Sequence, residues 1–85
     1  MASRSGFGKR FPARTSQTAK ALGRNVRRLR KEKGWTQDEL AAKVKLEQTA
    51  ISLIENNRAN PTLSTLEALA AAFKIPFVEL FEAGT

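Results

Sequence analysis

The amino-acid sequence predicts a single all-α domain built from five short helices. Apolar residues recur three or four positions apart in five separate stretches, and helix-capping residues separate these stretches. No stretch alternates between apolar and polar residues in the way a half-buried strand does. The chain has 85 residues, which is enough for one small domain.

The first helix is expected to begin near Thr18. Leu22, Val26 and Leu29 form one apolar stripe along it. Gly34 ends the helix, because glycine adopts the left-handed conformation of a C′ residue at little cost. Residues 1–17 are small, polar and basic. We therefore expect a flexible basic arm there, followed by the domain in the remainder of the chain.

Two short helices follow, separated by a turn of three residues. Thr36 is the expected N-cap of the second helix, and Glu39 three positions later completes a capping box. This helix ends near Val44. After the turn of residues 45–47, the third helix is expected to run from about Gln48 to Glu55.

The fourth and fifth helices complete the predicted domain. Residues 56–61, NNRANP, are rich in turn formers and predict a loop. Thr62 or Ser64 caps the fourth helix, whose buried side is expected to contain Leu63, Leu66, Leu69, Ala70 and Phe73. Pro76 suits the first turn of a short last helix, in which three residues share one face: Phe77, Leu80 and Phe81.

The positive charge of the chain is high and unevenly distributed. The formal net charge is +7, yet residues 35–85 carry only four basic residues against seven acidic ones. Such a basic balance in a short chain favours a polyanionic partner, namely DNA, RNA or an anionic membrane. A membrane-binding helix needs a strongly apolar face opposite its basic face. The bases of residues 20–33 surround only a narrow apolar stripe, so we expect no membrane association.

The absence of cysteine and histidine excludes several kinds of site. Disulfides and catalysis by cysteine or histidine are ruled out, and nearly every zinc site with them. No other reactive side chains gather in an inferred cleft, so we expect no enzyme, cofactor, metal ion or small-molecule ligand. The longest apolar run, residues 68–73, is too short to cross a bilayer, and no secretory signal is visible. These observations favour a cytoplasmic location.

The segment of residues 37–56, QDELAAKVKLEQTAISLIEN, has the clearest functional meaning. Small Ala41 occupies the expected crossing of its two helices, and a helix held this way with a polar outer face fits the major groove of DNA. The segment resembles the Cro/CI-type, lambda-repressor-like helix-turn-helix family, which includes phage repressors and restriction–modification controller proteins. The resemblance extends over residues 20–82 through LRKEKGWTQDELA, AISLIEN, the fourth helix after Pro61 and the final VELF.

The resemblance implies a role for individual residues. Base contacts are implied for four residues on the outer face of the third helix: Gln48, Thr49, Ser52 and Leu53. Phosphate contacts are implied at the start of the second helix and in the loop after the third: Thr36, Gln37, Asn56, Arg58 and Asn60. Arg30 and Glu55 match a family pair that forms a structural salt bridge between the first and third helices.

The function that the resemblance implies is transcriptional regulation by sequence-specific binding to double-stranded DNA. A homodimer would recognise a palindromic operator, with the last helix as the candidate interface through Phe77, Val78, Leu80 and Phe81. The alternative is a protein-interaction module of the bridging or antitoxin type that uses the same fold. The basic arm has two open roles, as an inert tail or as a minor-groove contact through its arginines.

Three positions depart from the family pattern. Lys45 in the turn and Lys74 after the fourth helix stand where the family has glycine. A lysine in the left-handed conformation costs about 1 kcal/mol relative to glycine, which the fold should tolerate. Glu47 replaces the usual Ser or Thr cap of the third helix. Its carboxylate either accepts a hydrogen bond from cytosine N4 or interacts with the helix dipole.

Overall fold

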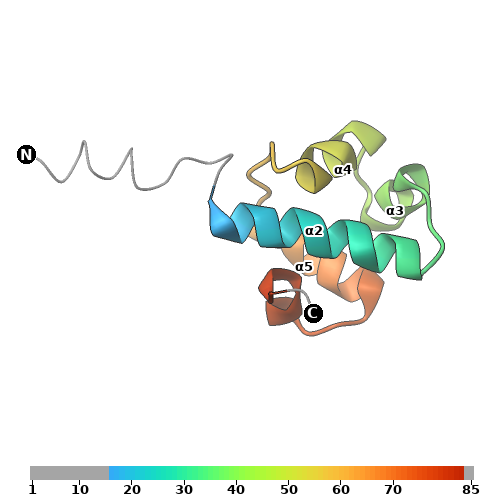
Figure 1. Ribbon diagram of the computed structural model, residues 1–85. Coiled ribbons are helices and arrows are strands. Elements are labelled where there is room, and N and C mark those ends of the chain that lie inside the picture. Colours follow the sequence, from blue (N-terminus) through green and yellow to red (C-terminus); the bar gives the residue numbers. More distant parts are fainter. Residues whose placement is uncertain (1–15, 84–85) are drawn as a thin grey trace, which may run out of the picture.

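The computed structural model describes residues 16–83 and contains four α-helices and one 3₁₀-helix in this range (Figure 1). These elements are α2 (Gln17–Glu32), α3 (Gln37–Val44), α4 (Gln48–Glu55), α5 (Leu63–Phe73) and the 3₁₀-helix η1 (Phe77–Phe81). The described residues form no strand, so the predicted all-α class is confirmed. None of the helices in this range is long and apolar enough to cross a membrane.

The prediction of five α-helices was wrong in its last element. η1 is a 3₁₀-helix of only five residues. The Glu79 N–H donates to the Pro76 carbonyl three residues earlier, with an N–O distance of 3.0 Å. A segment this short forms few α-helical hydrogen bonds, which favours the tighter 3₁₀ turn.

Helix α2 runs through the middle of the molecule, with α3 and α4 on one side and α5 and η1 on the other (Figure 1). Each element contributes one side chain with no exposed surface to the common core: Val26, Leu40, Ile51, Leu69 and Leu80. Trp35 is partly buried against this core and stacks on Phe73, with 5.9 Å between the ring centroids. The core therefore joins α3 and α4 to α5 and η1 in one unit.

Local capping fixes the helix boundaries. Ser16 caps α2 by accepting a hydrogen bond from the Ala19 N–H at 3.0 Å, so α2 begins at Gln17, one residue before the predicted start. The other residues of the predicted arm, 1–15, lie outside the described residues. The capping box that begins α3 is present, and Thr62, the first of the two predicted candidates, caps α5.

Left-handed residues end the helices where the sequence predicts. Gly34, Lys45 and Lys74 have φ angles of 75°, 60° and 59°. Each lysine turn has a 6→1 hydrogen bond. The Leu46 N–H donates to the Ala41 carbonyl, and the Ile75 N–H donates to the Ala70 carbonyl. The two lysines therefore adopt the conformation that the family usually gives to glycine.

Two core features differ from the sequence-based expectation. Leu63, predicted on the buried side of α5, is 63% exposed, because it is the first residue of the helix and lies beyond the packed turns. Asn25, which the sequence analysis did not single out, is buried and donates from Nδ2 to the carbonyls of Leu80 and Glu82, both at 2.8 Å. These bonds tie the C-terminal turn to α2.

Candidate nucleic-acid interface

The crossing of α3 and α4 sets the geometry of the candidate interface. Ala41 is 3% exposed at this crossing, and its small side chain permits a close approach of the two helices. Leu40 of α3 and Ile51 of α4 belong to the same buried core cluster. The two helices are thus held at a fixed angle, and the outer face of α4 stays at the surface.

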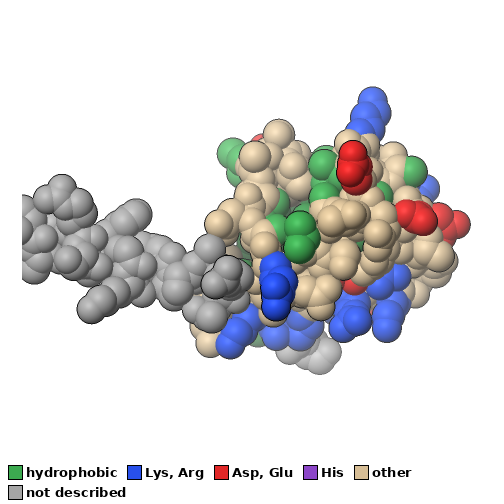
Figure 2. Space-filling view, turned by 90° about the horizontal axis from the view of Figure 1, so that it is seen from above, with side chains coloured by type: hydrophobic (Ala, Val, Ile, Leu, Met, Phe, Trp, Pro, Cys, Tyr) green, Lys and Arg blue, Asp and Glu red, His purple; other side chains and the backbone are tan. Residues whose placement is uncertain are grey.

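Three of the four predicted base-contact residues are well exposed on α4. Gln48 and Thr49 lie in its first turn, Leu53 is 39% exposed, and Ser52 is half-buried. Figure 2 views the molecule from the side on which α4 lies in Figure 1. Mostly uncharged surface occupies the centre of this face with a few Asp and Glu side chains beside it, and Lys and Arg side chains gather mainly along one edge (Figure 2).

A chain of hydrogen bonds joins the exposed end of α4 to the interior. Gln48 donates from Nε2 to Oε1 of Gln37, and Gln37 donates from its own Nε2 to Oε1 of Glu55 at 3.1 Å. Arg30 donates to both carboxylate oxygens of Glu55, from Nε at 2.6 Å and from Nη2 at 3.1 Å. The Arg30–Glu55 salt bridge is therefore present, and Gln37 couples it to Gln48.

The electrostatics of Glu55 reflect this network. Burial alone raises the pKa of the Glu55 carboxyl. Hydrogen bonds from Arg30 and Gln37 and the positive charges of Arg30 and Arg27 outweigh burial, so the pKa of Glu55 lies below its ordinary value. Hydrogen bonding to Glu55 holds the pKa of Arg30 above its ordinary value. Arg30 also donates from Nη1 to the Trp35 carbonyl at 2.8 Å, which fixes its position.

The predicted phosphate contacts lie on both sides of α4 in the chain. The Thr36 hydroxyl accepts from the Glu39 N–H at 3.0 Å, which leaves its own hydrogen available. The Asn56 side chain donates to the Ser52 carbonyl at 2.8 Å, while Arg58 and Asn60 are exposed in the loop that follows. We call the nine predicted contact residues the recognition surface: Thr36, Gln37, Gln48, Thr49, Ser52, Leu53, Asn56, Arg58 and Asn60. Glu47, at the N-cap of α4, makes no side-chain capping bond.

One member of the predicted dimer interface has a different place. Leu80 has no exposed surface and belongs to the core of the domain, so it anchors η1 to the core and cannot contact a partner. Val78 is 62% exposed, and Phe77 and Phe81 are half-buried with their ring centroids 5.6 Å apart.

A close contact between α2 and the end of α4 was not predicted from the sequence. A Cβ atom at Gly23 would lie 2.4 Å from Oδ1 of Asn57 and 2.7 Å from the Ile54 carbonyl oxygen, so only glycine fits. Asn57 has a φ of 63°, and its Oδ1 is buried without a hydrogen-bond partner among residues 16–83. The glycine in the interior of a regular helix was the available signal for this contact.

Two short helices crossing at a small residue, with a polar outer face on the second, define a helix-turn-helix protein. The family model described as Helix-turn-helix matches residues 26–80, and the chain belongs to this family.

Three similar proteins show what the family contains. The chain is 46% identical over 61 residues to the uncharacterized HTH-type transcriptional regulator y4dJ of Sinorhizobium fredii, covering 72% of this chain and 79% of that protein. It is 44% identical over 54 residues to the immunity repressor protein of Bacillus phage phi105, covering 64% of this chain and 38% of the repressor.

The crystal structure of the restriction-modification controller protein C.AhdI from Aeromonas hydrophila aligns with a TM-score of 0.71 at 32% identity, over 74% of this chain and 96% of that chain. The predicted resemblance to phage repressors and controller proteins is thereby confirmed. The family comprises transcriptional regulators rather than enzymes.

Proposed function

We propose that this chain is a transcriptional regulator that recognises a palindromic operator in double-stranded DNA, through the major groove and as a homodimer. The observation that carries the proposal is the hydrogen bond from Gln48 to Gln37. One N–H of the Gln48 amide is used in this bond. Its second N–H and its carbonyl oxygen stay available for N7 and N6 of an adenine, which is the bidentate pairing of glutamine with that base.

The neighbouring residues of α4 complete base recognition. Thr49 and Ser52 offer hydroxyl groups, which donate to or accept from base edges. Leu53 exposes apolar surface that suits contact with a thymine methyl group.

Phosphate contacts on both flanks of α4 position it in the groove. On one flank, the first turn of α3 presents Thr36 and Gln37 at the positive end of the helix dipole. On the other flank, Asn56, Arg58 and Asn60 follow α4. Such contacts set the register of a protein on the duplex without specifying its sequence.

The surface of η1 supports dimerisation. η1 has three apolar side chains with exposed surface, Val78, Phe77 and Phe81, which we treat as one apolar patch. A two-fold dimer built on this patch would double the base contacts and place two α4 helices in half-sites about 34 Å apart.

Selection from randomised duplex DNA at two salt concentrations tests the proposal. We expect the purified protein to retain a palindromic motif at both concentrations. Binding without a motif that disappears at the higher salt would contradict the proposal, because it would reflect phosphate attraction alone.

A further inference from the structure

The recognition segment carries no excess of positive charge, although its proposed ligand is a polyanion. Residues 35–62 contain three bases, Lys43, Lys45 and Arg58, and four acids, Asp38, Glu39, Glu47 and Glu55. Lys43 Nζ also lies over the Trp35 ring, 4.6 Å from its centroid. This segment alone therefore offers little net attraction to phosphate, the term that dominates affinity for DNA, and other cations of the molecule are expected to add to it.

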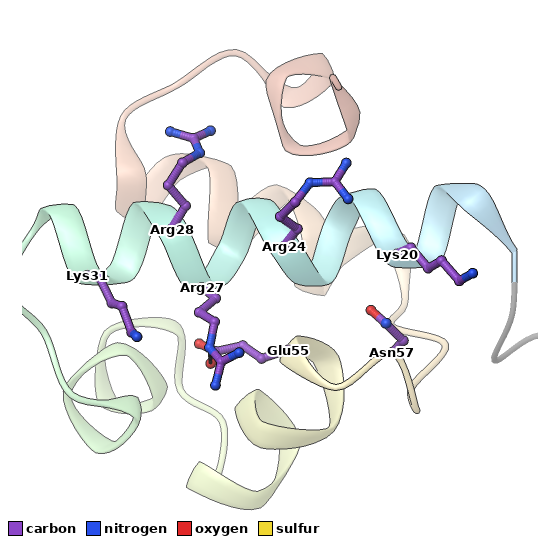
Figure 3. A pocket seen from close by; sticks show the side chains of 7 residues that line it. All are labelled: Lys20, Arg24, Arg27, Arg28, Lys31, Glu55 and Asn57. Atoms are coloured by element: carbon purple, nitrogen blue, oxygen red, sulfur yellow. Dashed lines mark ion pairs between the residues drawn. The ribbon is translucent and has the colours of Figure 1, made fainter. Parts of the chain in front are cut away.

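Helix α2 supplies this charge on one surface. Five cationic side chains line a shallow hollow of about 460 Å³ between α2 and the end of α4 (Figure 3): Lys20, Arg24, Arg27, Arg28 and Lys31. We call these five residues the α2 basic face. Within this face, Arg27 and Lys31 point toward the edge next to α3 and α4, and Arg24 and Arg28 point toward the other edge (Figure 3). The face extends about 16 Å along the helix, at a rise of about 1.5 Å per residue.

Little negative charge compensates the α2 basic face within residues 16–83. Arg28 pairs with exposed Glu32 at 3.1 Å. Arg27 lies 3.9 Å from Glu55, whose carboxylate already binds Arg30. Lys20, Arg24 and Lys31 have no ion pair in this part of the chain. The face therefore presents uncompensated positive charge to solvent.

The composition of the α2 basic face favours a nucleic-acid strand over a protein partner. Protein interfaces are anchored by apolar or aromatic side chains, and none of the exposed large apolar residues of the described chain lines this hollow. A run of cations about 16 Å long matches a strand that carries a charge every 3.4 Å or so along the duplex axis.

The hollow is also continuous with the proposed phosphate contacts. Asn57 lines it, and its chain neighbours Asn56 and Arg58 belong to the recognition surface (Figure 3). A DNA strand that passes along this loop would continue onto α2. We propose that the α2 basic face binds phosphates of the duplex outside the operator half-site, and that it adds to the sequence-independent part of the affinity. This inference rests on the proposed function.

The test compares two double variants that lose the same charge. Arg24→Gln/Lys31→Gln removes two cations of the α2 basic face, and Lys33→Gln/Lys74→Gln removes two exposed lysines elsewhere. The dissociation constant is measured against salt concentration for three duplexes: the selected operator with about one helical turn of flanking DNA on each side, a scrambled duplex of equal length, and the operator trimmed to its half-sites.

For Arg24→Gln/Lys31→Gln we expect the slope of log K against log salt to become shallower by about 0.9 for each phosphate that the variant no longer neutralises. The fold loss of affinity should be the same on the operator and the scrambled duplex, and it should disappear on the trimmed operator. The control double variant should resemble the wild type on all three duplexes.

Three results would overturn the inference: an equal effect in the control variant, a loss confined to the operator sequence, or a loss that persists on the trimmed duplex. Failure of the proposed function gives a different result. In that case the wild type shows no preference for any sequence, while the α2 variant alone still has the shallower slope on flanked duplexes.

Discussion

At the scale of single residues, Glu55 joins the interior of the molecule to its recognition surface. It is buried, it accepts from Arg30 and Gln37, and through Gln37 it is linked to Gln48. The sequence predicted the Arg30–Glu55 pair through the family pattern. The bonds of Gln37 could not be predicted, because they connect residues 11 and 18 positions apart whose side-chain orientations depend on the packed crossing of the helices.

Removal of Arg30 tests the role of this ion pair in stability. We expect Arg30→Met to lower the free energy of unfolding at neutral pH by about 3–5 kcal/mol, because it leaves a buried carboxylate without its main partner. Arg30→Met/Glu55→Leu should lose less than the single variant. Chemical denaturation of the three proteins measures these values, and equal stability of Arg30→Met and wild type would contradict the expectation.

The same variant should reverse the contribution of Glu55 to the pH dependence. In the wild type, the pKa of Glu55 is below its ordinary value of 4.5, so its contribution is present above that value and is lost as the pH falls through the lowered pKa. In Arg30→Met, burial dominates and raises the pKa. The folded state then binds the proton more tightly, so the stability gap to the wild type should narrow on acidification. A gap that stays constant from pH 7 to about pH 3 would contradict this account.

At the scale of helices, the contact of Gly23 with the end of α4 holds two elements together. We expect Gly23→Ala to destabilise the fold by about 1–3 kcal/mol, although alanine is the better helix former, because the new Cβ meets backbone oxygen at 2.7 Å. Gly23→Ala/Asn57→Gly should recover part of the loss by removing the nearest side-chain atom and relieving a positive φ. Thermal unfolding measures both, and a melting temperature for Gly23→Ala at or above the wild type would contradict the contact.

The left-handed turn between α3 and α4 gives a second prediction at this scale. Lys45→Gly should leave stability unchanged or raise it by up to about 1 kcal/mol, because glycine adopts the φ of 60° without strain. Ala42→Gly, in the interior of α3, is the matched control and should lower stability by about 1 kcal/mol. A clear fall in the melting temperature of Lys45→Gly would be inconsistent with the turn conformation.

Helix boundaries were predictable from sequence wherever local chemistry sets them. The capping box of Thr36, the span of α4 and the left-handed end at Gly34 depend on a few neighbouring residues. The left-handed ends at Lys45 and Lys74 were expected from the family pattern. The exposure of Leu63 and the burial of Leu80 were not predictable in this way. Both have the apolar side chain and spacing of a core residue, and only the packing of the whole domain separates them.

At the scale of the whole molecule, the proposed dimer depends on the surface of η1. We expect Val78→Arg to raise the dissociation constant of the dimer by about tenfold or more, because it places a charge in an apolar contact. Leu63→Arg is the control, since Leu63 is exposed to the same degree, 63% against 62%, and lies outside the proposed interface. Sedimentation equilibrium measures both, and a Val78→Arg protein that stays as dimeric as the wild type would refute this interface.

We propose that different helices provide the affinity for DNA and the sequence specificity. The cations concentrate on α2, while the outer face of α4 presents mainly neutral groups (Figures 2 and 3). We propose that this neutral face selects the base sequence. Gln48 is expected to contribute most to this selection, because the hydrogen bond to Gln37 orients its amide in the absence of DNA.

Selection from randomised duplex DNA by wild type and Gln48→Ala in parallel tests this claim most directly, with Gln17→Ala, an exposed glutamine at the start of α2, as the control. We predict a palindromic motif for the wild type. Gln48→Ala should lose the preference for adenine at one position of each half-site, at a cost of about 1–3 kcal/mol on the wild-type operator. Identical motifs from all three proteins, or no motif from the wild type, would contradict base recognition by α4.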